Sequence, residues 1–217
     1  MTTRASPSIS TRKQPKQSRS ADLVATVLQA AVQVLAEEGA ARFTTARVAE
    51  RAGVSVGSLY QYFPNKAAIL FRLQADEWLQ TTAMLRTILE EAGRPPLERL
   101  RALTHAFVRS ECEEASVRQA LGDAAPLYRD APEAQAVRVA GSPIMDAFLA
   151  EILPDVGEAR RTLAGDLITT TLGQAGKAFS ESPRTEAEIA AWSDAMADMF
   201  CAYLAGLGSA APLAEKG

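Results

Sequence analysis

The sequence has few of the residues that build metal, disulfide and catalytic sites. Its 217 residues include 2 cysteines and 1 histidine. Cys112 and Cys201 are far apart in the chain, and neither has other cysteines or histidines clustered near it, which argues against a zinc site and a disulfide framework. His105 falls near Cys112 on a helical wheel, but an incidental pair is the commoner explanation of that spacing. Glycine-rich phosphate loops and metal-ligand spacings are also missing, so we expect no enzyme, no metal and no cofactor.

Long apolar runs and strand patterns are missing as well. No run of about 18 apolar residues occurs, and the first twenty residues are polar and basic, without the apolar segment of a signal peptide. We therefore expect a cytoplasmic protein with no membrane partner. Sustained period-two alternation and hairpin-turn signals are absent too, so the expected fold class is all-α.

The formal net charge of −3 conceals an uneven distribution of charge. Residues 1–66 hold 9 lysines and arginines against 4 acidic residues, whereas residues 67–217 hold 14 against 22. A basic part joined to an acidic part is typical of a protein that meets a polyanion at one end only. The first 66 residues are therefore the expected nucleic-acid-binding part.

The most informative pattern runs from Thr44 to Lys66 and predicts a helix-turn-helix that binds double-stranded DNA. Ala49 is small enough for two helices to cross, and Gly53 can adopt the positive φ of a tight turn. Ser55 suits the N-cap of the second helix, whose first turn would face base edges. A hairpin that only packs has similar spacings, but the basic segment before it and the phosphate-binding side chains after it favour DNA.

The composition divides the chain into four parts. We expect a flexible basic arm at residues 1–19, a three-helix DNA-binding head at 20–66, a larger helical regulatory and dimerisation body at 67–208, and a flexible tail at 209–217.

Capping residues predict where individual helices begin and end. Gly39 should follow the first helix, and Asn65 should cap a long helix that ends near residue 93. Pro96 and Pro143 stand where later helices start, and the segment 185–188 has the pattern of a capping box.

The last two helices, at about 158–181 and 185–207, are apolar on more than one face, which indicates burial on two sides. Glycines inside the first of them each cost about 1 kcal/mol relative to alanine and indicate close approach of another helix. We expect a four-helix interface with a second copy of the chain, and the alternative is a monomeric core of closely packed helices. The expected interface residues are Leu172, Gly176, Phe179, Trp192, Met196, Met199, Phe200 and Tyr203.

The order of motifs in residues 20–70 resembles the TetR family of bacterial transcriptional regulators. These motifs are a Thr-Thr cap, Val-Ala-Glu-Arg-Ala-Gly-Val, Ser-Val-Gly-Ser-Leu-Tyr-Gln-Tyr-Phe and Pro-Asn-Lys. The remainder agrees only in length and helical character. The resemblance implies a homodimer, a ligand cavity inside the body, and repression that is released when ligand binds.

The resemblance also implies roles for residues at matching positions. Contacts to the DNA backbone are expected from Thr44, Thr45, Tyr60, Tyr62 and Lys66. Base reading is expected from Ser55, Val56, Gly57 and Ser58, with Gln61 and Arg47 as further candidates. Val56 and Ala46 stand where the family often has longer polar side chains, so DNA shape should carry more of the specificity.

Two hypotheses compete for the body. One is a pocket for a small hydrophobic or amphipathic effector, and the other is a plain hydrophobic core, since aromatic and methionine residues at helical spacing are common in cores. The expected pocket residues are Trp78, Met84, Phe107, Tyr128, Met145, Phe148 and Thr171. The expected function is a ligand-responsive repressor that binds a palindromic operator as a homodimer. The alternative is an activator, or a regulator that responds to a protein partner or to cysteine oxidation.

Overall fold

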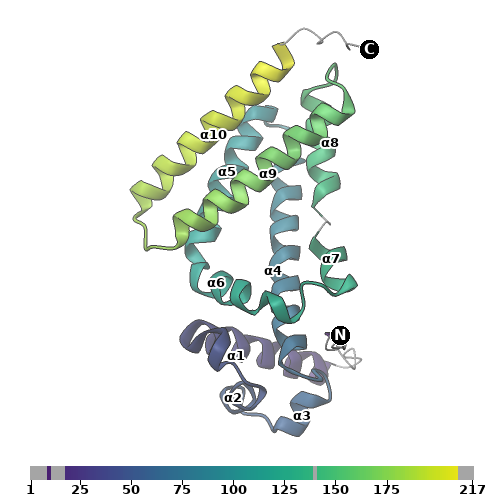
Figure 1. Ribbon diagram of the computed structural model, residues 1–217, viewed down its shortest axis with the longest axis vertical. Coiled ribbons are helices and arrows are strands. Elements are labelled where there is room, and N and C mark those ends of the chain that lie inside the picture. The colour runs from purple at the N-terminus through teal and green to yellow at the C-terminus, as the bar shows by residue number, and fades with distance from the viewer. Residues whose placement is uncertain (1–8, 11–17, 139–140, 210–217) are drawn as a thin grey trace, which may run out of the picture. The chain divides into compact units, whose positions relative to one another are not determined.

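The structure is a computed structural model that describes residues 9–10, 18–138 and 141–209. Every regular element within these residues is helical, as the sequence predicts (Figure 1). The helices are α1 (Ser18–Arg42), α2 (Thr45–Arg51), α3 (Val56–Tyr60), α4 (Lys66–Leu89), α5 (Pro96–Glu113), α6 (Ala115–Ala124), the 3₁₀ helix η1 (Ala125–Leu127), α7 (Pro132–Arg138), α8 (Ser142–Ile152), α9 (Glu158–Ser180) and α10 (Glu186–Ser209).

The chain forms two compact units. The head unit comprises Met1–Leu79 and Ser116–Val139, and the body unit comprises Gln80–Ala115 and Ala140–Gly217. This division differs from the expected boundary after residue 66, because Leu121 of α6 and Ala134 of α7 are buried in the same core cluster as α1. Short alanine-rich helices have weak apolar periodicity, so the sequence did not reveal these two.

The head unit is built around the side chains that join α1 to the helix-turn-helix. Val27, Phe43, Val48, Leu59 and Phe63 are fully buried there. By length and hydropathy alone, Ser20–Arg42 is apolar enough to cross a membrane. Its buried face lies in this core, however, and burial inside a folded unit explains the same composition.

Local chemistry fixes two helix starts as expected, but the first helix does not end before Gly39. Helix α1 continues to Arg42 and kinks at Gly39, where φ is +71°. The backbone N–H of Ala68 donates to Asn65 Oδ1 at 2.9 Å, which caps α4. The capping box before α10 is formed, with Thr185 N–H donating to Glu188 Oε2 at 2.8 Å and Glu188 N–H to Thr185 Oγ1 at 3.3 Å.

The N-terminal arm expected at residues 1–19 differs from the expectation at its four described residues, since Ser18 and Arg19 already belong to α1. Ile9 is 4% exposed and packs in the head core, and Ser10 Oγ donates to Glu133 Oε1 of α7 at 3.1 Å. One isoleucine within a polar segment is enough to anchor it locally, because burial of such a side chain contributes about 1.5–3 kcal/mol. The arm's basic residues 4, 12, 13 and 16 and the tail at 210–217 lie outside the described residues.

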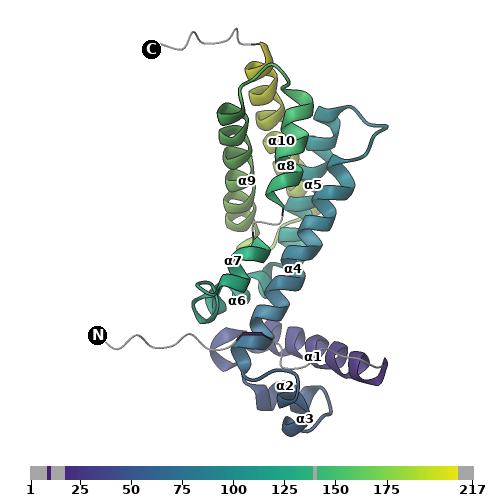
Figure 2. The same cartoon turned by 90° about the vertical axis from the view of Figure 1, so that its right-hand side faces the viewer.

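In the body unit, α5 contacts both α9 and α10, and α8 contacts α9 (Figures 1 and 2). Close packing explains two glycines of α9. A Cβ atom at Gly165 would stand 3.1 Å from Leu149, and one at Gly176 would stand 3.3 Å from Phe107. These glycines therefore let α9 approach helices of its own chain.

Candidate nucleic-acid interface

Two N-caps and one glycine set the geometry of the helix-turn-helix. Thr44 Oγ1 accepts from Arg47 N–H at 3.3 Å at the start of α2. Gly53 has a φ of +67° in the turn, as predicted. Ser55 Oγ accepts from Ser58 N–H at 3.0 Å at the start of α3, which confirms its expected capping role. Both caps leave further backbone N–H groups free for an anion at the helix ends.

The side of α3 that faces away from the core is open to solvent. Val56 is 39% exposed and Tyr60 is 40% exposed, and Gly57 and Gln61 are exposed beside them. The hydroxyl groups of Thr45 and Tyr60 lie 3.1 Å apart and hydrogen-bond. This contact holds one hydroxyl from α2 next to one from α3, as a shared phosphate-binding position requires.

The expected DNA-contacting residues all belong to the head unit, but they differ in exposure. Thr44 and Ser55 are exposed, and Thr45, Arg47, Ser58 and Lys66 are half-buried. Tyr62 is only 7% exposed because it packs in the head core, so little more than its edge is free for a phosphate.

Acidic residues of α1 hold the arginines of α2. Arg47 forms an ion pair with Glu38, and Arg51 donates to Glu37 Oε1 at 2.9 Å. The hydrogen bond and charge of the Arg51 guanidinium lower the pKa of Glu37. Sequence reasoning missed both acidic partners, because no spacing rule pairs residues from different helices.

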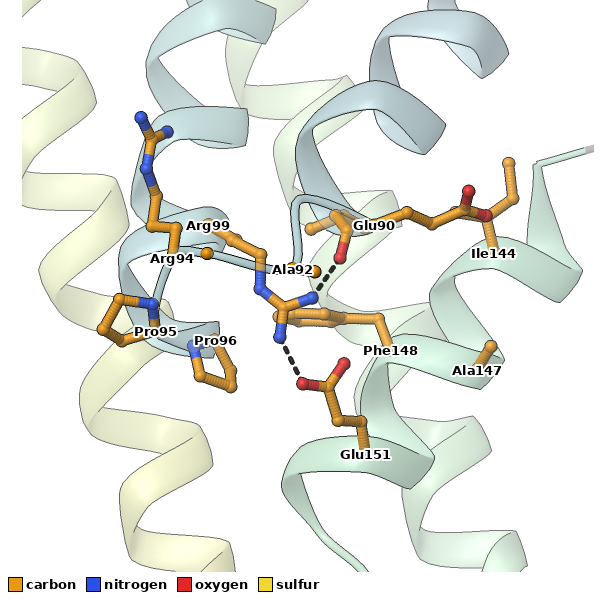
Figure 3. A pocket seen from close by; sticks show the side chains of 12 residues that line it. Glu90, Ala92, Arg94, Pro95, Pro96, Arg99, Ile144, Ala147, Phe148 and Glu151 are labelled. Atoms are coloured by element: carbon orange, nitrogen blue, oxygen red, sulfur yellow. Dashed lines mark hydrogen bonds and ion pairs between the residues drawn. The ribbon is translucent and has the colours of Figure 1, made fainter.

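The expected pocket residues are divided between the two units. Trp78 and Tyr128 lie in the head unit, where the Tyr128 hydroxyl donates to the Leu121 carbonyl at 3.0 Å and burial raises the pKa of Tyr128. The other five lie in the body unit. Of the seven, only Phe148 lines the body-unit cavity drawn in Figure 3, which has a volume of about 590 Å³. Sequence reasoning missed the charged residues that line this cavity, Glu90, Arg94, Arg99 and Glu151.

Most of the expected interface residues are buried within the protomer. Leu172, Gly176, Phe179, Met196 and Phe200 are buried in the body unit. Helices α9 and α10 both contact α5, so the surface left for a second copy is narrower than expected. Trp192 stacks on Phe179 at 4.6 Å but remains 39% exposed, Met199 is 51% exposed, and Tyr203 is half-buried.

Two further exposed apolar side chains, which the sequence reasoning missed, are leucines of α9. Leu163 is 63% exposed and Leu167 is 49% exposed, one turn apart on α9. A Cβ atom at Gly173 would meet nothing within 4 Å. The spacing of the two leucines was readable from the sequence, but their exposure depends on which face of α9 packs on α5 and α8.

The cysteines and the histidine do not form a pair. His105 Nε2 lies 3.0 Å from Asp194 Oδ1. Burial raises the thiol pKa of both Cys112 and Cys201, which disfavours the reactive thiolate. Within the described ranges, no group of three His, Cys, Asp or Glu side chains could hold a metal ion.

Comparison with known proteins places this geometry in a family. Residues 27–73 match the family model described as bacterial regulatory proteins, tetR family, and residues 95–207 match the model described as tetracyclin repressor-like, C-terminal domain. The chain is 40% identical over 85 residues to the nucleoid occlusion factor SlmA of Vibrio campbellii, which is 38% of this chain and 42% of the relative. It is 29% identical over 138 residues to the HTH-type transcriptional repressor KstR of Rhodococcus jostii, which is 64% of this chain and 63% of the relative.

The chain thus spans less than two thirds of the length of these two relatives. In fold it is similar to the fatty acid degradation regulator FadR from Bacillus halodurans, with a TM-score of 0.66 and 20% identity over 87% of this chain and 97% of that chain. The two matched models together cover both the helix-turn-helix and most of the body. The chain belongs to the TetR family of bacterial regulatory proteins.

Proposed function

We propose that this protein is a transcriptional repressor that binds a palindromic operator as a homodimer and leaves it when a small effector binds the body. The observation that carries the proposal is the exposed face of α3 beside the paired Thr45 and Tyr60 hydroxyls. A helix-turn-helix places the start of its second helix in the major groove, and flanking hydroxyls and backbone N–H groups anchor the DNA backbone.

The exposed apolar surface of α9 and α10 supports the homodimer. Leu163, Leu167, Trp192 and Met199 are large apolar side chains that water contacts in the isolated protomer. Covering them on a second copy would remove this apolar area from water, and a twofold interface would place two heads about one DNA turn, 34–36 Å, apart.

The chemistry of the thiols disfavours one alternative, a regulator that senses oxidation through Cys112 or Cys201. Oxidation proceeds through the thiolate, and burial raises the thiol pKa of both residues. The choice between repressor and activator rests on the position of the operator relative to the promoter.

The test measures binding of the protein to the intergenic DNA beside the gene. Fluorescence anisotropy reports this binding at several salt concentrations. We expect a preferred site with inverted-repeat symmetry, and an affinity that falls steeply with salt because phosphate contacts release counterions. Equal affinity for that DNA and for scrambled DNA of the same composition would contradict the proposal.

A further inference from the structure

The strongest unassigned feature of the body unit is an arginine buried against a cavity. Arg99 of α5 is 4% exposed, yet it lines the cavity of about 590 Å³. The cavity lies between the α4–α5 connection and α8, and Figure 3 shows the Arg99 guanidinium between Pro96, Phe148 and Glu151. Its volume is in the range of small-molecule sites.

Three contacts fix the guanidinium in place. Its Nη1 donates to the carbonyl of Leu89, the last residue of α4, and its Nη2 donates to Glu151 Oε1. Its central carbon lies 5.5 Å from the centre of the Phe148 ring. The head group of Arg99 is therefore held in one orientation before any ligand arrives, which reduces the entropic cost of binding.

One donor of this guanidinium is unused. Arg99 Nε is buried and has no hydrogen-bond partner among the described residues. Nε and Nη2 form one edge of the planar group, and such an edge matches the two oxygens of a carboxylate. Glu151 takes only Nη2, with a single oxygen, so a carboxylate that replaces Glu151 could use both donors of the edge.

Glu151 is a replaceable partner. Its side chain is 51% exposed, whereas that of Arg99 is 5% exposed. A half-exposed carboxylate can turn into water at little cost, because water replaces the contact that it loses, but a buried arginine cannot.

The apolar lining indicates the rest of the ligand. Leu89, Ile144, Ala147 and Phe148 supply apolar surface next to the charged edge. A molecule that fits has a carboxylate at one end and a hydrocarbon body of moderate length.

We propose that this cavity binds an amphipathic carboxylate, which displaces Glu151 and takes both Nε and Nη2 of Arg99. The site would be the effector site of the proposed repressor, and in that respect it rests on the proposed function. Binding itself requires no DNA, so it is tested separately.

The test is isothermal titration of the full chain with octanoate, using 1-octanol as the uncharged probe of similar length. We expect saturable binding of octanoate and at least about tenfold weaker binding of 1-octanol, since a charge-assisted pair is lost. Equal affinity for the two probes, or no saturable octanoate binding to any form of the protein, would overturn the proposal.

Glu151→Gln is the decisive variant because it should improve binding. It keeps the size of the side chain but removes the charge that competes for Arg99, so the Kd for octanoate should fall about tenfold. Glu90→Gln is the matched control: Glu90 lines the same cavity but pairs with Arg86 at 3.8 Å, and its loss should change the Kd less than about threefold. An unchanged or weakened Kd in Glu151→Gln, or equal gains in both variants, would refute displacement.

Arg99→Lys keeps the positive charge but lacks the two-donor edge, so it should bind octanoate at least about tenfold more weakly. The thermal unfolding midpoint of Arg99→Lys shows whether this variant still folds. If it does not fold, the titration of Glu151→Gln tests the proposal alone.

Octanoate that binds the protein but leaves operator affinity unchanged would support this site and contradict the proposed ligand response. Failure to bind operator DNA would leave the titration result intact.

Discussion

At the scale of single residues, capping and charge pairing organise the head unit. Ser55 Oγ accepts from Ser58 N–H and also lies 2.8 Å from Ser58 Oγ. Arg47 and Arg51 are drawn toward α1 by Glu38 and Glu37. The arginines of α2 are thereby oriented before DNA is present, and the start of α3 is held in its helical form.

Loss of the α3 cap should destabilise the head unit. Ser55→Ala leaves Ser58 N–H without its acceptor, at a cost of about 1 kcal/mol in the free energy of unfolding. Urea denaturation measures this, with Thr26→Ala as the control: the Thr26 hydroxyl bonds the Asp22 carbonyl inside the exposed part of α1 and caps no helix. Equal stability of the Ser55→Ala variant and the unmutated protein would mean that the cap contributes nothing.

Lys66 and Arg47 should affect DNA binding in different ways. Lys66→Ala should weaken binding to all sequences alike and lower the slope of log affinity against log salt by about one. Arg47→Ala should in addition relax sequence preference, since we expect its half-exposed side chain to leave Glu38 and reach a base edge. Anisotropy on a panel of operator variants measures both, and indistinguishable mutants would contradict this division of roles.

At the scale of elements, the sequence predicts where turns lie and where helices start. It does not predict which faces of the helices pack on one another. Gly53, Ser55, Asn65 and the Thr185–Glu188 box act locally, so residue type alone determines their geometry. The partners of Arg47 and the cavity position of Arg99 depend on which helices meet, and one sequence does not specify this.

The turn between α2 and α3 provides a matched pair of glycine substitutions. Gly53→Ala should destabilise the head unit by about 1–2 kcal/mol, because an L-residue is strained at a φ of +67°. Gly57→Ala should be neutral or stabilising by up to about 1 kcal/mol, because Gly57 is helical and its added Cβ would lie 3.8 Å from the nearest atom, Ser55 Oγ. Denaturation without DNA compares the free energies of unfolding of the two variants. Equal changes in both would contradict backbone strain at residue 53.

The capping box of α10 should respond to acid. Hydrogen bonds from Thr185 N–H and the Thr185 hydroxyl lower the pKa of Glu188 below its ordinary 4.5. A lowered folded-state pKa means that the stabilisation is present above the unfolded pKa and lost as pH falls through the folded value. Glu188→Gln should therefore flatten the fall of the melting temperature below about pH 5. Glu181→Gln, an exposed neighbour, is the control, and identical pH profiles would contradict the effect.

At the scale of the whole molecule, each of the two units exposes one surface to which we assign a role. The head unit exposes α3, and the body unit exposes apolar side chains of α9 and α10. Five of the eight expected interface residues are buried in the protomer's own core, because a helix with two apolar faces uses one of them internally.

The exposed apolar surface should determine the oligomeric state. Leu167→Glu places a charge on the proposed interface and should shift the protein toward monomer in sedimentation velocity at micromolar concentration. Leu97→Glu is the control, since Leu97 is 39% exposed on α5 of the same unit and outside that surface. If the Leu167→Glu variant is still a dimer, the interface does not include this surface of α9.

The proposed function requires that two copies of this chain together read one inverted repeat. Sedimentation equilibrium gives the mass of the complex on the operator from the adjacent intergenic DNA and on the same duplex with one half-site scrambled. We expect two chains on the intact operator and at least about tenfold weaker binding when one half-site is lost. One chain per duplex, or equal affinity for both duplexes, would contradict it.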